Sequence, residues 1–196
     1  MNPNQNDGKL VFCPPKIPQS EHILLKELIL YIANRLTLHP KFGATKLNKI
    51  LFYSDFIAYA ELGDSITGER YWRLPKGPAP RFLVQVRKQM LKADEIVCYS
   101  VNTLSGRQDR IAPKRPADLK KFIPEQISIV ERVIEELKDK DAFEVSRLSH
   151  KFIGWKIVKE RQDIPYETVF LRDPKDITVT EKDREIALKL AEKYGL

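Results

Sequence analysis

Apolar residues recur every three or four positions along most of the chain, which is the spacing of an amphipathic helix. Each run follows a residue that suits the first turn, either a polar side chain that can cap it or a proline that fits it. The pattern predicts six helices, which begin near Ser20, Thr45, Pro80, Pro124, Asp141 and Thr180. The chain is therefore predicted to be mainly helical.

The second of these helices has the most informative pattern. It runs from Thr45 to Gly63, and a glycine is the residue that most often ends a helix. Its spacing predicts a buried stripe made of Leu47, Ile50, Leu51, Ser54, Ile57 and Ala58. Four aromatic residues are expected around the flanks of the stripe: Phe52, Tyr53, Phe56 and Tyr59.

Between the second and fourth helices the sequence favours strands and turns. Residues 65–74 predict a short hairpin or extended loop, and residues 95–101 predict a strand onto which 109–112 folds back. Residues 168–171 predict one more brief strand or an extended passage. We expect a mainly α, α+β fold: a compact bundle of about five to six helices with a small antiparallel β insertion near 65–112.

The chain has 196 residues, which fits a single domain. Residues 1–19 are polar and rich in proline, so they predict a flexible N-terminal arm. The helical domain is expected over 20–171, and a helical extension over 172–196 is expected to pack on the same domain.

Composition narrows the class of protein. With 42% hydrophobic and 31% charged residues, the chain is not typical of fibrous, low-complexity or disordered proteins. The sequence has no apolar run of membrane-spanning length and starts with a polar segment, so we expect a cytoplasmic protein without a membrane partner. Two free, buried thiols are predicted for Cys13 and Cys98.

The net charge of +7 is unevenly distributed. Residues 66–121 carry 13 basic and 5 acidic groups, while the segments on either side are nearly balanced. Such a segment could bind nucleic acid, an acidic protein surface or acidic helices of its own chain, or it could be a solvated face. The basic residues fall mostly in predicted hairpin and loop, whereas a DNA-reading protein would carry them on a recognition helix.

Candidate catalytic groups are few and scattered. The three histidines, His22, His39 and His150, lack the spacing of metal ligands, so no metal or cofactor is expected. Ser149 and His150 are neighbours in a helix and point about 100° apart, which is poor geometry for a nucleophile and its base. An enzyme would need them to meet Asp55, which is better interpreted as a hydrogen-bond anchor.

Residues 71–80, YWRLPKGPAP, combine aromatic side chains, cations and prolines. Aromatic and arginine side chains are enriched where proteins bind each other, and prolines reduce the entropy lost on binding. Alternatively, Tyr71 and Trp72 pin this segment to the core. The candidate partner-binding residues are Arg70, Tyr71, Trp72, Arg73, Lys76, Pro78, Pro80 and Arg81.

Three ordered motifs carry a family resemblance, with a weaker fourth. The segment KLNKILFYSDF at 46–56 is similar to KLxKLLYFAD, SITGERY at 65–71 to SITGxxY, and LPKGPAP at 74–80 to LPxGPxP. A weaker match follows at Leu148, Ser149 and His150, then at Gly154 and Trp155, and then at 164–166. Over about 45–166 the chain resembles the SocA-like, phage-associated GepA group, the Panacea antitoxin domain. The motif positions are Lys46, Leu47, Lys49, Tyr53, Asp55, Gly68, Gly77, Ser149, His150 and Trp155.

This resemblance implies a helical, non-enzymatic antitoxin of a toxin-antitoxin system. The partner would be a cognate toxin, encoded by an adjacent gene and neutralised by direct contact. The SocA branch also implies a protease as a second partner, with the antitoxin acting as an adaptor that delivers the toxin to it. The alternative hypothesis is a nucleic-acid-binding protein that uses the basic segment 66–121, with Tyr71 and Trp72 stacking on unpaired bases.

Overall fold

The computed structural model describes residues 22–103, 106–172 and 181–194. It is mainly helical with two small antiparallel sheets, which confirms the predicted fold class. The helices are α1 (Ile23–Leu36), α2 (Ala44–Leu62), α3 (Leu83–Lys92), α4 (Pro124–Leu137), α5 (Ala142–His150), α6 (Ile153–Ile157) and α7 (Glu181–Tyr194), with short 3-10 helices η2 (Leu119–Lys121) and η3 (Tyr166–Phe170). The strands are β1 (Tyr71–Trp72), β2 (Ala79–Pro80), β3 (Ile96–Thr103), β4 (Gly106–Pro113) and β5 (Asp163–Ile164).

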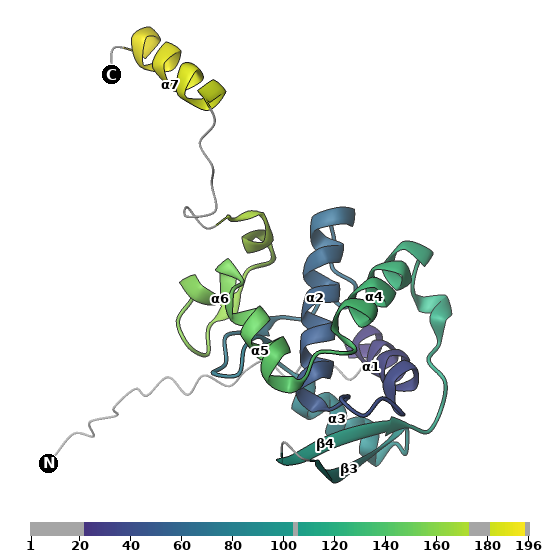
Figure 1. Cartoon of the computed structure of the whole chain (residues 1–196). Helices are drawn as coiled ribbons and strands as arrows, with labels where there is room; N and C mark the ends of the chain where they lie inside the picture. Colours follow the sequence, from purple (N-terminus) through teal and green to yellow (C-terminus); the bar gives the residue numbers. More distant parts are fainter. Residues whose placement is uncertain (1–21, 104–105, 173–180, 195–196) are drawn as a thin grey trace, which may run out of the picture.

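Helix α2 lies at the centre of the domain, between α1 and α4 on one side and α5 and α6 on the other (Figure 1). It ends at Gly63 as predicted, where a φ of 82° lets the glycine N–H bond the carbonyl of Tyr59. Its start was expected at Thr45, but the extended Gly43 occupies the N-cap and Thr45 lies inside the first turn. The predicted stripe is buried except for Ile57, which is half-buried.

The assignment of Phe52 and Phe56 to the flanks of α2 is wrong, because both are fully buried. They belong to a second, aromatic core with Tyr71 and Ile164, separate from the main core of α1 to α4. The rings of Phe52 and Phe56 lie 4.4 Å apart, and each meets the ring of Tyr71 edge-on at 5.6 Å. Helix α2 is therefore buried on two sides, which a single predicted stripe does not capture.

Two predicted helix starts are confirmed and a third is wrong. Pro124 is the first residue of α4, and Asp141 caps α5 in a capping box with Glu144. Pro80 does not begin α3, because it pairs with Tyr71 in a sheet and the helix starts at Leu83. The predicted caps Ser20 and Thr180 lie outside the described residues; the residue before α1 is His22, and α7 is helical as expected.

The first sheet joins distant parts of the chain in the order β2-β1-β5. Tyr71 pairs with Pro80 on one side and with Ile164 on the other, so the segment after α6 closes over the motif segment. Strand β5 was not predicted. The strand or extended passage predicted at 168–171 is wrong up to Phe170, since 166–170 form η3, whose turns are closed by the carbonyls of Pro165 and Thr168.

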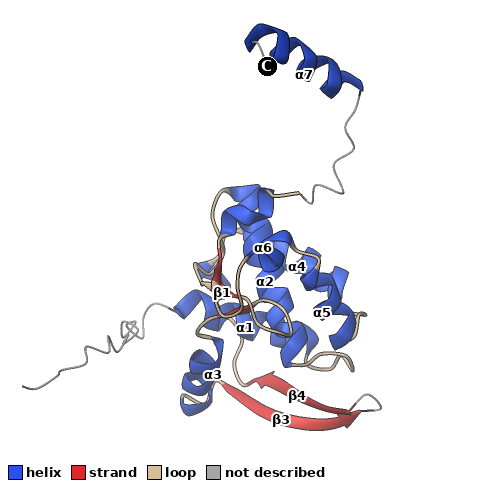
Figure 2. Ribbon diagram, turned by 90° about the vertical axis from the view of Figure 1, so that its left-hand side faces the viewer, coloured by secondary structure: helices blue, strands red, loops and turns tan. Residues whose placement is uncertain are grey.

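The second sheet is the predicted hairpin, β3 paired with β4 from Ile96 and Pro113 to Thr103 and Gly106. Figure 2 shows this hairpin at one end of the domain, away from β1. Cys98 on β3 is free and exposed, so its predicted burial is wrong, while Cys13 lies outside the described residues. Among the described helices, none has the length and hydropathy needed to cross a bilayer.

Candidate functional site

Asp55, on the inner side of α2, is completely buried and holds the segment that follows the helix. Its Oδ1 accepts the backbone N–H groups of Ile66 and Thr67, each at 2.9 Å. Its Oδ2 accepts the hydroxyl of Tyr71 at 2.7 Å and the hydroxyl of Thr67. Burial raises the pKa of Asp55 to about 6, although these hydrogen bonds favour the ionised form. Asp55 is thus the predicted hydrogen-bond anchor.

The SITG motif forms a turn on this anchor. Gly68 has a φ of 69°, a conformation that favours glycine, and its N–H bonds the hydroxyl of Ser65. The next residue, Glu69, is buried against His22, and its backbone carbonyl accepts the hydroxyl of Tyr166 at 2.6 Å. Each position of the motif therefore has a structural role in directing the chain into β1.

The two motif lysines of α2 are also buried. Lys46 donates to the carbonyl of Lys138 at the end of α4, and Lys49 donates to the carbonyl of Pro78 at 2.9 Å. Lys46 is 1% exposed and Lys49 is 2% exposed. Desolvation lowers the pKa of Lys46 to about 8 and that of Lys49 to about 7. Leu47, between them, lies in the main core. These lysines fasten α4 and the 74–80 loop to α2.

The 74–80 loop packs closely on α2 and α5 at Gly77. This glycine has a φ of 95°, and a Cβ there would lie 2.3 Å from the Ser149 hydroxyl oxygen and 2.6 Å from the Lys49 ammonium nitrogen. Only a glycine satisfies both the backbone conformation and this close approach. Ser149 is itself buried and donates to the carbonyl of Ser146 at 2.8 Å.

His150 and Trp155 close the other side of the loop. Their rings stack at 4.1 Å, and the Trp155 indole N–H donates to the carbonyl of Leu74 at 3.1 Å. The guanidinium of Arg73 lies 4.4 Å above the Trp155 ring. Burial lowers the pKa of His150, and its Nε2 is buried without a partner in the described part of the chain.

The hypothetical catalytic group of Asp55, Ser149 and His150 is not assembled by these contacts. The partners of Asp55 come from 66–71, whereas Ser149 and His150 contact α5, α6 and the 74–80 loop. Over the described ranges, no cluster of three or more His, Cys, Asp or Glu residues could hold a metal ion.

The candidate partner-binding residues divide by exposure. Tyr71 is 0% exposed, and Pro78 and Pro80 are also buried. Tyr71 thus fits the alternative in which it pins the segment to the core, since a buried ring is not available to a partner. The exposed or half-exposed candidates are Arg70, Trp72, Arg73, Lys76 and Arg81.

Part of the basic segment is neutralised by acids of the same chain. Arg70 and Arg81 both bind Asp163, with Arg81 at 2.9 Å. Arg115 binds Glu27 at 2.9 Å and Glu95 at 2.6 Å. The sequence left open acidic helices of the same chain as partners, but of these three acids only Glu27 lies in a helix, while Asp163 lies in β5 and Glu95 in the turn before β3. Within the described ranges, the side chains of four lysines of the segment have no such partner: Lys76, Lys88, Lys92 and Lys120.

Sequence reasoning missed several residues that complete the site. Asp163 neutralises two of the candidate arginines, and Tyr166 supports the turn at Glu69. The weak motif match at 164–166 was the only signal that this distant segment belongs to the same domain, and it did not indicate pairing with β1. Ser146 was missed as well, and its hydroxyl donates to the backbone carbonyl of Lys76 at 2.9 Å.

With the motifs located, the relationship to known proteins can be stated. A family model described as the SocA-like antitoxin, Panacea domain, matches residues 47–156, more than half of the chain. The protein belongs to this antitoxin family. No curated protein and no solved structure matches it. The Panacea match extends from α2 to α6 and includes the Asp55 anchor, the SITG turn and the 74–80 loop, which confirms the resemblance carried by the motifs.

Proposed function

We propose that this protein is the antitoxin of a toxin-antitoxin pair and neutralises its toxin by direct protein–protein contact, without catalysis. The family match over 47–156 is the observation that carries this proposal. The toxin is encoded by an adjacent gene, and both proteins act in the cytoplasm. In the manner of the SocA branch, the chain also serves as an adaptor that delivers the toxin to a protease.

The arrangement of the motifs supports a binding role. Three hydrogen bonds fix the 70–81 segment: Asp55 accepts from Tyr71, Lys49 donates to Pro78 and Trp155 donates to Leu74. A surface loop fixed in this way loses little conformational entropy when a partner binds. The contact surface includes at least part of the set Arg70, Trp72, Arg73, Lys76 and Arg81, whose residue types are among those enriched at binding hot spots.

The experiment is co-expression of the tagged chain with the product of the adjacent gene, followed by purification at moderate salt after nuclease treatment. We expect a stoichiometric complex and relief of growth arrest caused by the partner. If no complex forms, and nucleic acid is recovered when nuclease is omitted, the antitoxin proposal fails in favour of nucleic-acid binding. Affinity for nucleic acid would then fall steeply with salt.

A further inference from the structure

Two adjoining cavities lie on either side of the tip of the 74–80 loop. One, of about 490 Å³, is lined by Phe143, Arg147 and His150 of α5, and the other, of about 350 Å³, by Asn48 and Lys49 of α2. Pro75 and Lys76 line both, so the two cavities form one surface, which we call the Lys76 face.

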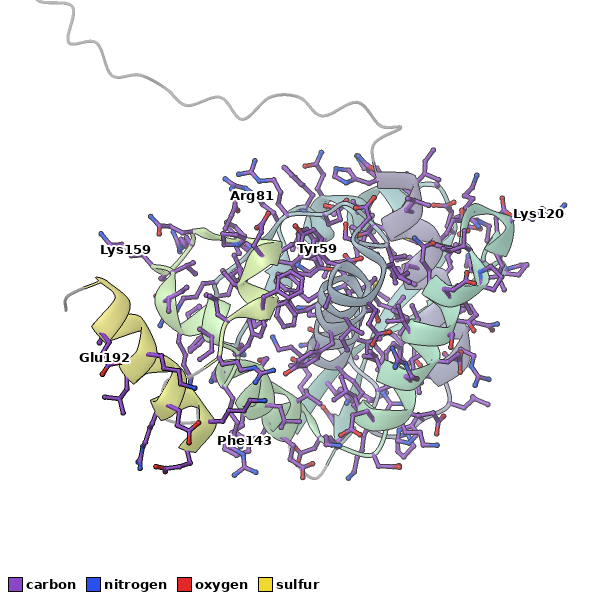
Figure 3. All side chains as sticks on the ribbon, turned by 90° about the horizontal axis from the view of Figure 1, so that it is seen from above. Tyr59, Arg81, Lys120, Phe143, Lys159 and Glu192 are labelled. Carbon is purple, nitrogen blue, oxygen red and sulfur yellow. The ribbon has the colours of Figure 1, made fainter. Side chains whose placement is uncertain are left out.

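The Lys76 face carries a large exposed apolar side chain beside its cations. Phe143, at the start of α5, is 73% exposed. An exposed ring beside a cavity offers a partner apolar area to bury, and burying one phenyl ring contributes about 2 kcal/mol. In Figure 3, Phe143 and Arg81 lie on opposite sides of the molecule, so this surface is distinct from the one around Asp163.

The charge of the Lys76 face is also uncompensated. Of the described residues, no Asp or Glu lines either cavity, whereas Lys49, Lys76 and Arg147 do. None of the three cations is paired with a carboxylate in the described part of the chain. The acids nearest to Arg147 in sequence, Glu144 and Asp141, bind each other's backbone in the capping box of α5.

Buried polar groups on this face lack partners as well. Lys49 is 2% exposed, and its ammonium donates to the Pro78 carbonyl but is paired with no carboxylate among the described residues. Nε2 of His150 and Oδ1 of Asn48 are buried without a hydrogen-bond partner over the described ranges. A buried cation without a counter-ion is unfavourable, and an anion placed nearby relieves that penalty.

We propose that the Lys76 face is the docking site of the partner protein and binds an acidic segment of it. A carboxylate of that segment lies between Lys76 and Arg147, and an adjacent apolar side chain packs against Phe143. This inference rests on the proposed function, in which the chain acts by binding a toxin. It narrows the contact surface to its Lys76 end and assigns the chemistry of the partner.

The test uses the complex with the product of the adjacent gene. A carbodiimide reagent joins an ammonium group directly to a carboxylate with which it is paired, and mass spectrometry locates the link. We expect Lys76 to be linked to an Asp or Glu of the partner. The double variant Lys76→Glu and Arg147→Glu should weaken binding about 100-fold, because like charges placed opposite each other at an interface are strongly unfavourable.

The matched control is Lys88→Glu, which reverses another exposed lysine without a side-chain partner in the described part of the chain. It should change affinity less than about 3-fold. Phe143→Ser should weaken binding without altering the melting temperature, since the ring is exposed. Changing the linked partner acid to Lys should restore binding to the double variant.

The possible failures are distinguishable. If the wild-type chain does not bind the adjacent gene product, the proposed function fails and the docking site fails with it. If the wild type binds, but the double variant binds equally well and the links involve other lysines, only the assignment of the Lys76 face is overturned. Circular dichroism of each variant separates lost binding from lost folding.

Discussion

The surface around Asp163 and the Lys76 face are built from the same short segment but differ in electrostatics. On the first, Arg70 and Arg81 share the carboxylate of Asp163. On the second, Lys76 and Arg147 lie beside an exposed phenyl ring with no carboxylate partner in the described residues. A charge that is already paired has less to gain from a partner than one that is not.

This difference shows why a count of charges along the chain does not locate a binding site. The segment 66–121 has eight more basic than acidic groups. Several of its cations are satisfied by acids that are distant in sequence, such as Glu27 and Asp163. Arg147, in contrast, lies outside that segment and joins Lys76 only because α5 packs beside the loop. The fold decides which charges remain available.

Both surfaces depend on the Asp55 anchor, so its loss should remove them together and have the largest effect. Asp55→Ala leaves two backbone N–H groups and two hydroxyls without their acceptor. We expect a loss of about 4 kcal/mol in the free energy of unfolding, because unsatisfied buried donors retain their full desolvation penalty. Urea denaturation followed by circular dichroism gives this value.

The conservative variant Asp55→Asn is the control for this prediction. It keeps an oxygen for the two backbone donors but presents an amide N–H₂ to the hydroxyls of Thr67 and Tyr71. The loss should therefore be about half as large. Equal stability of Asp55→Ala and the wild type would contradict the anchor role.

A change at Gly77 should separate the two surfaces. Gly77→Ala places a methyl group against Ser149 and Lys49 and strains a backbone with a φ of 95°. We expect a loss of about 2–3 kcal/mol and displacement of the loop under Lys76. Gly68→Ala is the matched control, since its φ of 69° brings strain but no atom within 4 Å, and about 1 kcal/mol is expected. Equal losses would mean that close packing at Gly77 is unimportant.

Much of the framework could be predicted from local sequence, because capping boxes, helix-starting prolines and glycine stops are short-range signals. Pro124, Asp141 and Gly63 were assigned on that basis. The helix start predicted at Pro80 is wrong because a proline also suits a sheet position where its missing N–H is not required. Tertiary pairing with Tyr71 decided between these two uses.

The candidate site could be predicted less fully. The motifs identified Asp55, Gly77 and Trp155, but their partners come from other elements. Burial of Tyr71 follows from the aromatic core, to which residues 152–170 contribute. No local pattern indicates that this distant segment returns to pair with β1. The exposure of Phe143 and its position beside Lys76 are likewise set by helix packing.

The titration of Lys49, on the Lys76 face, should have a smaller effect on the free energy of unfolding. The ordinary pKa of lysine is about 10.5, and burial lowers that of Lys49 to about 7. Between these values the unfolded chain binds a proton on this residue that the folded chain does not. The stability contribution of Lys49 therefore rises with pH over this interval, by up to about 1.4 kcal/mol per pH unit.

The comparison with Lys49→Met isolates this contribution. The variant should lack this increase. The unfolding free energy of the wild type minus that of the variant should therefore rise from pH 7 to pH 9. Lys46→Met controls for the other buried lysine, whose pKa of about 8 gives a contribution that rises from a higher pH. Parallel stability curves for wild type and Lys49→Met would contradict the desolvation of this ammonium.

The smallest effects on stability distinguish the two surfaces most directly. Arg81→Glu places a second acid beside Asp163 and should lower the free energy of unfolding by about 1 kcal/mol. Lys76→Glu breaks no side-chain interaction in the described part of the chain and should change stability by less than about 0.5 kcal/mol. The order should reverse for binding, because only Lys76 lies where an acidic partner is expected. If Arg81→Glu weakens the complex more than Lys76→Glu does, the partner docks on the surface around Asp163 and the arginines there exchange their internal carboxylate for one from the partner.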